Sequence, residues 1–213
     1  MNNTSNQLET DILSQKAEHL LKKLCLISLL FISINVTSAQ KQGSEYIDSL
    51  KLRTPLAVED TNKAELLAKL SFEYYGFNTD LGIKYGEQAL VLSQKLGWKK
   101  GIAWAYNSIG SNWAIKSNYP RALECYMKSL SMYTEIGDKK RIANASNNLG
   151  WLYNSEKEYA KAFGFLNKAI KIYTEINDVN GLASTYANLG IFYSYQGNWP
   201  VYGEKRMKTQ ISP

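Results

Sequence analysis

Histidine and cysteine are almost absent from this sequence. Its 213 residues contain one histidine, His19, and two cysteines, Cys25 and Cys125. His19 and Cys25 lie in an N-terminal segment that we expect to be removed, so the rest of the chain holds Cys125 alone. That part therefore has no Cys–His or Ser–His catalytic pair, no histidine–metal site and no internal disulfide. We interpret Cys125, within the helical stretch LECYMK, as a small buried thiol.

Other signatures of enzymes are missing as well. The sequence has no P-loop, no GxSxG, no HExxH and no glycine-rich dinucleotide turn. The carboxylates of Glu156 and Glu158 stand in the stretch SEKEY, where we interpret them as solvated residues of a helix surface. We therefore expect a protein that is not an enzyme, with no catalytic residue, no bound metal and no cofactor.

The main hydrophobic run is too short to cross a bilayer. It covers residues 24–36, which is 13 residues against the ~20 that a membrane-spanning helix needs. Lys22 and Lys23 precede it, and small residues follow it in VTSAQ. This pattern is typical of a secretory signal peptide cut after about Ala39. Residues 1–39 thus predict export to the periplasm or another extracytoplasmic space. The alternative is an uncleaved segment in which residues 24–36 anchor the chain to a membrane.

Charge is not concentrated in any one stretch. The net charge is +6, but the basic residues are spread over short groups such as KKG, DKKR and EKRMK. Scattered charges of this kind are typical of a solvated helical surface, so we expect no nucleic-acid partner.

One pattern recurs every 40 residues. Residues 101–140 align with 141–180 without a gap, a partial copy follows at 181–200, and a weaker copy precedes them at 61–100. A fixed period of this length predicts a stacked array of supersecondary units. Residues 40–60 are then a lead-in or capping segment. The positions identical between the two full copies, in the numbering of the first, are Ile102, Ala103, Ala105, Asn107, Gly110, Tyr119, Ala122, Lys128, Tyr133, Thr134, Glu135, Ile136 and Asp138.

Apolar spacing predicts two antiparallel helices in each unit. We expect the first helix near residues 101–116, 141–156 and 181–196, and the second near 80–96, 119–136 and 159–176. Helix-ending and helix-starting residues support these limits. The expected C-terminal residues are Gly97, Gly137 and Asn177; the expected N-terminal residues are Asp138, Asp178, Asn78, Asn118 and Asn198, with Pro120 and Pro200 in the first turn.

Glycine stands in the middle of the first helix in three copies, at Gly110, Gly150 and Gly190. A glycine there costs ~1 kcal/mol relative to alanine. The repeated cost predicts a close helix crossing, at which we expect Ala122 or Ala162 to face the glycine.

These residues resemble the tetratricopeptide repeat, whose signature is a large residue, Leu-Gly, an aromatic three residues later, and then Ala, an aromatic and Ala. The resemblance covers roughly residues 61–200. It departs in its 40-residue period and at Leu70 and Gly82 in the first unit. It implies an all-α fold, a right-handed α-solenoid of stacked helix hairpins with a concave groove. The matching residues are Tyr106, Ile109, Gly110, Trp113, Ala122, Tyr126 and Ser129; Leu149, Gly150, Tyr153, Ala162, Leu166 and Ala169; and Tyr186, Leu189, Gly190 and Tyr193.

The resemblance also implies which residues line that groove. Asparagine amides at equivalent positions can bond a peptide backbone, and tryptophans offer large contact faces. The alternatives are that the asparagines bond neighbouring helices and that the tryptophans belong to the core. The candidate groove residues are Trp104, Asn107, Ser111, Asn144, Asn147, Trp151, Asn154 and Tyr195, with Ala114, Ser184, Ala187, Ile191 and Ser194 at the remaining positions.

The pattern stops in residues 201–213, where Tyr202, Arg206 and Thr209 occupy the places of Ala, an aromatic and Ala. This tail is either a polar capping helix or the mark of a unit cut short. The groove predicts a non-catalytic scaffold that binds a protein or peptide. The alternative is the sensor part of a membrane receptor of the histidine-kinase or transcriptional-regulator type, because extracytoplasmic repeats resemble such sensors. An exposed end of the array also predicts self-association.

Overall fold

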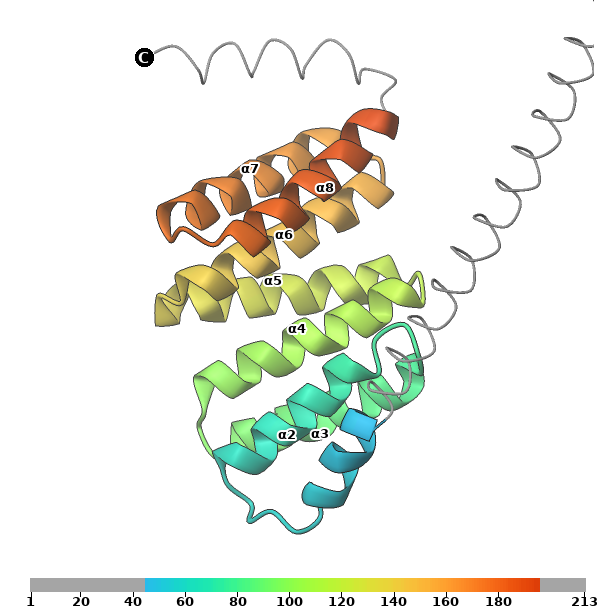
Figure 1. The fold of residues 1–213 in the computed structure, drawn as a ribbon, viewed down its shortest axis with the longest axis vertical. Helices are drawn as coiled ribbons and strands as arrows, with labels where there is room; N and C mark the ends of the chain where they lie inside the picture. Colours follow the sequence, from blue (N-terminus) through green and yellow to red (C-terminus); the bar gives the residue numbers. More distant parts are fainter. Residues whose placement is uncertain (1–44, 196–213) are drawn as a thin grey trace, which may run out of the picture. The chain divides into compact units, whose positions relative to one another are not determined.

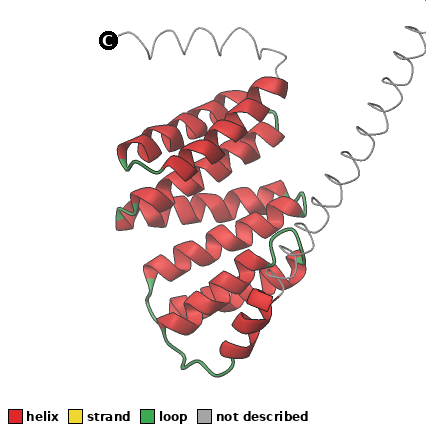
Figure 2. Cartoon of the chain, in the orientation of Figure 1, coloured by secondary structure: helices red, strands yellow, loops and turns green. Residues whose placement is uncertain are grey.

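The structure, a computed structural model, describes residues 45–195, except for the side chain of Tyr195. The chain divides into two units, residues 1–49 and 50–213, and the helices that follow residue 60 belong to the second. The described part consists of helices and connecting loops (Figure 1; Figure 2), as the sequence predicts. The helices that follow residue 60 are α2 (Thr61–Glu73), α3 (Thr79–Lys95), α4 (Lys99–Ile115), α5 (Tyr119–Ile136), α6 (Lys139–Ser155), α7 (Tyr159–Glu175) and α8 (Val179–Tyr195).

The helices pair as antiparallel hairpins, which confirms the α-solenoid. α2 packs on α3, α4 on α5 and α6 on α7, while α8 opens the next unit. Each predicted first helix begins two residues earlier than expected, at Lys99, Lys139 and Val179. The predicted signal segment, residues 1–39, and the tail, residues 201–213, lie outside the described residues. No helix within residues 45–195 combines the length and apolarity that a membrane span requires.

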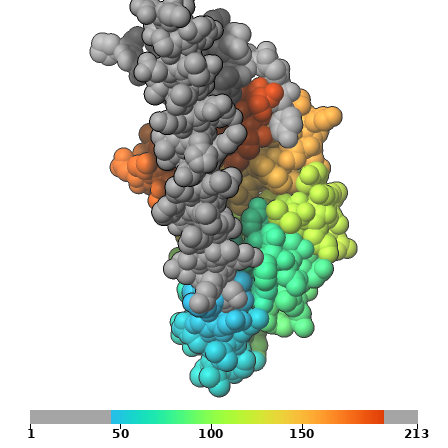
Figure 3. All heavy atoms as spheres, turned by 45° about the vertical axis from the view of Figure 1, so that its right-hand side comes forward, coloured from blue at the N-terminus to red at the C-terminus, as the bar shows by residue number. Residues whose placement is uncertain are grey.

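The first helices lie on the inner side of the stack. α2 contacts α4, α4 contacts α6 and α6 contacts α8, whereas among the described residues neither α3 and α5 nor α5 and α7 touch. Helices that meet their counterparts in the next unit lie on the inside of a curved stack, and those that do not are spread apart on the outside. Figure 3 shows the successive units following one another in chain order along the array.

The helix ends follow the predicted residues. Gly97, Gly137 and Asn177 take left-handed backbone conformations, with φ of 63°, 75° and 55°. Ser117 (φ 57°) and Lys157 (φ 62°) do the same at the ends of the first helices, although their residue types do not favour it. In both places the next amide still bonds back to the helix, so packing of the hairpin outweighs residue preference there.

Four of the predicted N-terminal residues act as caps. Their side-chain oxygens accept hydrogen bonds from backbone amides in the first turn of the following helix, which satisfies otherwise unpaired donors. Pro120 lies in the first turn of α5, as predicted. Asn198 and Pro200 lie outside the described residues. The four bonds are Leu81 to Asn78, Arg121 to Asn118, Arg141 to Asp138 and Gly181 to Asp178.

The predicted close crossing at the glycines is present, but its partner was wrong. A Cβ atom at Gly110 would lie 2.9 Å from the ring of Tyr126, and one at Gly150 would lie 2.7 Å from Leu166. The large residue of the second helix therefore sits over the glycine. Ala122 and Ala162 are fully buried in the same clusters but are not the nearest atoms. The large residue is nearer because the side chain one helical turn later reaches back across the crossing point.

In the first unit, a glycine replaces the usual alanine, and a buried asparagine fills the space that this leaves. Gly82 stands at the usual alanine position, and a Cβ there would lie 2.1 Å from the side chain of Asn112. Asn112 is fully buried and donates to the backbone oxygens of Ser71 and Ser108, both at 2.9 Å. The missing methyl group of Gly82 thus makes room for a polar residue where the next unit has Leu152.

One surface ion pair recurs in every described unit. It joins the start of a first helix to the end of its own second helix. In the first unit the two charges are exchanged, and the glutamate, Glu59, lies just before the N-cap of α2. The pairs are Glu59–Lys95 at 2.7 Å, Lys99–Glu135 at 3.3 Å and Lys139–Glu175 at 2.6 Å.

Candidate binding face

The predicted groove residues of α4 and α6 share one stripe on each helix. Asn107 and Ser111 are four residues apart on α4, and Asn147 and Trp151 repeat this spacing on α6. Because these helices lie on the inner side, the stripes together form a candidate inner face. This face is defined here as Trp104, Asn107, Ser111, Asn144, Asn147, Trp151 and Asn154.

Two asparagines of the inner face bond the next unit. The side-chain nitrogen of Asn148 donates to Oδ1 of Asn107 at 3.2 Å, and that of Asn188 donates to Oδ1 of Asn147 at 3.0 Å. The same bond therefore recurs 40 residues later. Asn107 and Asn147 hold neighbouring first helices together, as the alternative interpretation expected. The Nδ2 group of the half-buried Asn107 remains as a hydrogen-bond donor for a partner, whereas Asn147 is only 8% exposed.

Two further predicted residues are bonded within their own unit. The hydroxyl of Tyr173 on α7 donates to Oδ1 of Asn144. The hydroxyl of Tyr126 donates to Oγ of Ser111 at 3.2 Å, and Ser111 itself is buried. Burial raises the pKa of Tyr173 to about 12 and also raises the pKa of Tyr126, so both phenols remain protonated donors near neutral pH.

Asn154 is the most unusual polar residue of the inner face. Its side chain is only 5% exposed, and its Oδ1 lacks a hydrogen-bond partner within the described part of the chain. A buried, unpaired acceptor of this kind is costly, so Asn154 stabilises the array less than an apolar residue would. Tyr195, the last predicted groove residue, has no described side chain.

Both tryptophans combine packing with partial exposure. Trp104 packs against the buried cluster around Ala105, and the guanidinium of Arg141 lies 4.9 Å from the centre of its ring. Trp151 meets Tyr119 edge-to-face, with ring centres 6.5 Å apart. Each tryptophan is half-buried. One part of its ring packs in the core, and the remaining part is exposed, so each of the two interpretations holds for part of the side chain.

The partners that orient these residues were not predicted from the sequence: they are Asn148, Asn188, Arg141 and Tyr173. For three of them a signal existed, because Asn188 repeats Asn148 and Tyr173 repeats Tyr133 after 40 residues. Arg141 gave none, since the equivalent positions are Gly101 and Gly181.

Nothing in the described part nominates a catalytic or metal centre. No group of three or more possible metal ligands occurs within residues 45–195. Cys125 is a free, half-buried thiol, and burial raises its pKa to about 11. A thiol so rarely ionised is a poor nucleophile. The sequence predicted a buried thiol, whereas Cys125 is half-buried.

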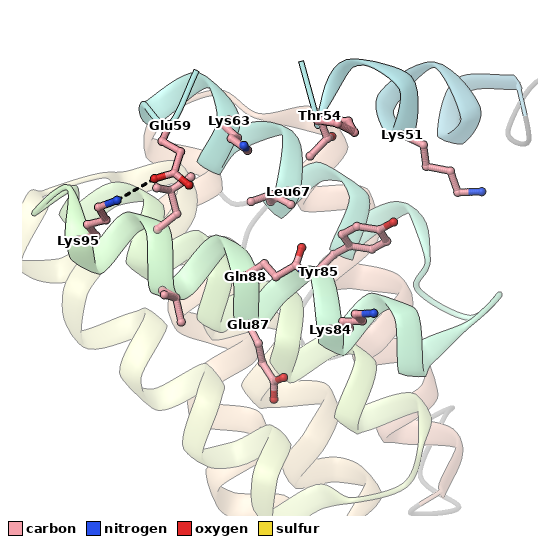
Figure 4. Close-up of a pocket in the computed structure, with 13 residues that line it drawn as sticks. Lys51, Thr54, Glu59, Lys63, Leu67, Lys84, Tyr85, Glu87, Gln88 and Lys95 are labelled. Carbon is pink, nitrogen blue, oxygen red and sulfur yellow. Dashed lines mark hydrogen bonds and ion pairs between the residues drawn. The ribbon is translucent and has the colours of Figure 1, made fainter. Parts of the chain in front are cut away.

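A separate recess of about 770 Å³ lies beside α3 (Figure 4). The ion pair between Glu59 and Lys95 lies at one end of the recess, and Lys51 and Lys84 lie toward its other end. Its remaining lining residues are Thr54, Pro55, Lys63, Leu67, Tyr85, Glu87, Gln88, Val91 and Leu92.

One family model matches part of the repeat array. Residues 101–175 match the model of the tetratricopeptide repeat family. A comparison with curated proteins gives no match. The matched residues are about a third of the chain and cover the second and third units of the array from Gly101 to Glu175.

The fold is similar to several solved helical arrays. BtubC (BKLC) from P. vanneervenii has a TM-score of 0.60 and 23% identity, covering 81% of this chain and 74% of its own. A Rap protein complexed with Competence and Sporulation Factor has a TM-score of 0.68 and 25% identity over 75% of this chain. The match spans only 46% of the Rap chain. TPR-like repeats of a putative kinesin light chain from Podosopora anserina have a TM-score of 0.61 and 12% identity, covering 81% of this chain and 91% of their own.

Proposed function

We propose that this protein is a non-catalytic scaffold that binds an extended segment of a partner protein along the inner face of α4 and α6. The observation that carries the proposal is the repeated geometry of that face. Asn107 and Asn147 occupy equivalent places, and the Oδ1 of each accepts a bond from the next unit, which directs its Nδ2 group as a donor. Asn107 is half-buried and Asn147 is 8% exposed, so Asn107 offers the more accessible donor. Equivalent donors on successive helices suit the regularly spaced carbonyls of an extended chain.

The half-buried tryptophans complete the proposed contact surface. Trp104 is held by Arg141, and Trp151 is held by Tyr119. Both side chains are therefore ordered before a partner binds, so binding would lose little side-chain entropy at these rings. Rigid aromatic surface of this kind contributes much of the energy in many interfaces. The complex of the similar Rap protein with Competence and Sporulation Factor supports the proposal by analogy of fold.

The test uses the full chain and a displayed library of random peptides. Ile115 and Ser155 continue the stripes of Asn107–Ser111 and Asn147–Trp151 by one more turn, so Ile115→Arg and Ser155→Arg would block the inner face. The matched control is Met127→Arg on α5, because Met127 is 44% exposed and Ile115 is 43% exposed. We expect selected peptides to lose at least about tenfold in affinity for the inner-face variants and to bind the control unchanged. Equal loss in all three variants, or none, would contradict the proposal.

Export is a second part of the proposal, supported by the sequence of residues 22–39. Fractionation of cells expressing a C-terminally tagged chain tests it. A shortened product outside the cytoplasm supports a cleaved signal, and a full-length product in the membrane fraction supports the anchor. A full-length cytoplasmic product contradicts export.

A further inference from the structure

Helix α8 exposes a face that the equivalent helices bury. Ala183 is exposed, whereas Ala103 and Ala143, at the same place in α4 and α6, are fully buried. Tyr186 is 50% exposed, whereas Ser146 is fully buried. The exposed stripe of α8, defined as Val179, Ala183, Tyr186, Ala187, Ile191 and Ser194, follows helical spacing along one side.

The opposite side of α8 is firmly packed. Leu189 and Phe192 are buried in a cluster with Leu166, and the ring of Phe192 lies 5.8 Å from that of Phe163. The hydrogen bond from Asn188 to Asn147 fixes the rotation of the helix against α6. α8 therefore keeps its exposed stripe turned away from the rest of the array.

The chemistry of α8 differs from that of its neighbours. Its sequence, VNGLASTYANLGIFYSY, contains no Asp, Glu, Lys or Arg, whereas each helix from α2 to α7 carries charged residues. Val179 is 74% exposed and Ile191 is 43% exposed. An uncharged stripe with exposed apolar residues is typical of a surface that another protein covers.

We infer that a second copy of this chain covers the stripe, with α8 packed against α8 of the other copy. The chain has a net charge of +6, so most surfaces would bring like charges together on self-contact, and α8 avoids this cost. Ala183, Ala187 and Gly190 are small residues at helical spacing, which allows two helices to approach closely.

The chain's own tail fits this place poorly. In register with α5 and α7, residues 202, 206 and 209 would face α8. They are Tyr202, Arg206 and Thr209, where α7 has Ala162, Leu166 and Ala169. An arginine would then face Gly190, at a crossing that a large apolar side chain occupies in the other units.

In a two-fold dimer of this kind, the residues near the symmetry axis can be tested directly. In a two-fold interface each residue meets its counterpart through the same surface patch. Ala187 lies at the middle of the stripe, so it would come close to Ala187 of the second copy. The stripe also contains the groove positions Ala187, Ile191 and Ser194, but not the face of α4 and α6 used in the proposed function. The two proposals can therefore fail independently.

The test measures the mass of the full chain by light scattering during size-exclusion chromatography. We expect twice the mass of one chain. Ile191→Glu and Ala187→Glu should each raise the dissociation constant at least about a hundredfold, because like charges would meet across the two-fold axis. Met127→Glu is the control, because Met127 is 44% exposed and Ile191 is 43% exposed. Circular dichroism checks that each variant is folded.

A disulfide test locates the contact. In a Cys25→Ser, Cys125→Ser background, Ala187→Cys should form a cross-linked dimer on mild oxidation, and Met127→Cys should not. A chain that stays monomeric at all concentrations overturns the inference. So does a dimer that persists in Ile191→Glu and leaves Ala187→Cys unlinked, since another surface would then hold the two copies together.

Discussion

The side-chain amide of Asn148 donates to that of Asn107 across neighbouring units, and Asn188 makes the same bond to Asn147 one unit later. The array is thus held together on its inner side by a repeated polar contact as well as by apolar packing. The same contact orients the half-buried Asn107 on the candidate inner face, while Asn147 lies buried beneath it. The pair of Asn107 and Asn148 therefore serves both the stacking of units and the surface that they present.

Replacing Asn188 with alanine should destabilise the end of the array. The change leaves Oδ1 of the buried Asn147 without its donor, which costs about 1–3 kcal/mol of unfolding free energy. Ser184→Ala, at an exposed position of the same helix, should change it by less than about 0.5 kcal/mol. Urea unfolding measures both, and a double-mutant cycle with Asn147→Ala isolates the bond. A coupling energy of zero would show that the bond is absent in solution.

Two glycines should respond in opposite ways to alanine. A Cβ at Gly150 would lie 2.7 Å from Cγ of Leu166 and 3.2 Å from its backbone nitrogen, so Gly150→Ala should cost about 1–3 kcal/mol. Gly164 lies within α7 with open space around it, so Gly164→Ala should stabilise by about 0.5–1 kcal/mol. Thermal melts of the two variants give the comparison. If both stabilise the protein, the close crossing at Gly150 is refuted.

Stability should fall at alkaline pH in part through Tyr173. Burial raises the pKa of Tyr173 to about 12, against about 10 in an unfolded chain. The folded state therefore favours the neutral phenol. The stability that this provides is fully present below pH 10 and is lost as the pH rises toward 12. The ionisation of Tyr173 contributes up to about 1.4 kcal/mol per pH unit to the slope of the unfolding free energy against pH.

The variant Tyr173→Phe tests this dependence. It should lose the hydrogen bond to Asn144 at neutral pH, yet show a shallower decline in stability between pH 10 and 12. Unfolding in urea at several pH values gives the slope for each protein. Identical slopes would mean that Tyr173 ionises normally in the folded chain.

Cys125 should react slowly with alkylating reagents. Burial raises its pKa from 9.0 to about 11, which lowers the thiolate fraction at pH 8 about a hundredfold. In a Cys25→Ser chain, iodoacetamide should therefore modify the native protein at least about a hundredfold more slowly than the protein in urea. Equal rates in the two conditions would show that Cys125 is exposed and ordinarily acidic.

The regular parts of this molecule could be predicted because they repeat. Gly137 and Asn177 end their helices as expected, since the same register had to satisfy both copies. The residue that faces Gly150 could not be assigned from spacing alone, because Ala162 and Leu166 lie on the same side of α7 and only the crossing point decides between them. Residues that break the repeat, such as Arg141, carried no periodic signal.

The groove residues show a similar division. The positions of Asn107 and Asn147 on one stripe follow from the 40-residue period. Their bonding partners depend on the separation of α4, α6 and α8, which a single sequence does not provide. Asn144 was assigned to a partner, but its Oδ1 is taken by Tyr173 from the helix behind it.

The exchanged charges of Glu59 and Lys95 bear on how the chain avoids assembling its similar hairpins in the wrong combination. If the first helix of the first unit met the second helix of the next, Glu59 would face Glu135. In the reverse combination, Lys99 would face Lys95. The second and third units have no such protection, because Lys99 and Lys139 each suit Glu135 and Glu175 equally well. Errors of hairpin exchange during refolding should therefore concentrate between residues 99–136 and 139–175, and the first unit should find its own partner.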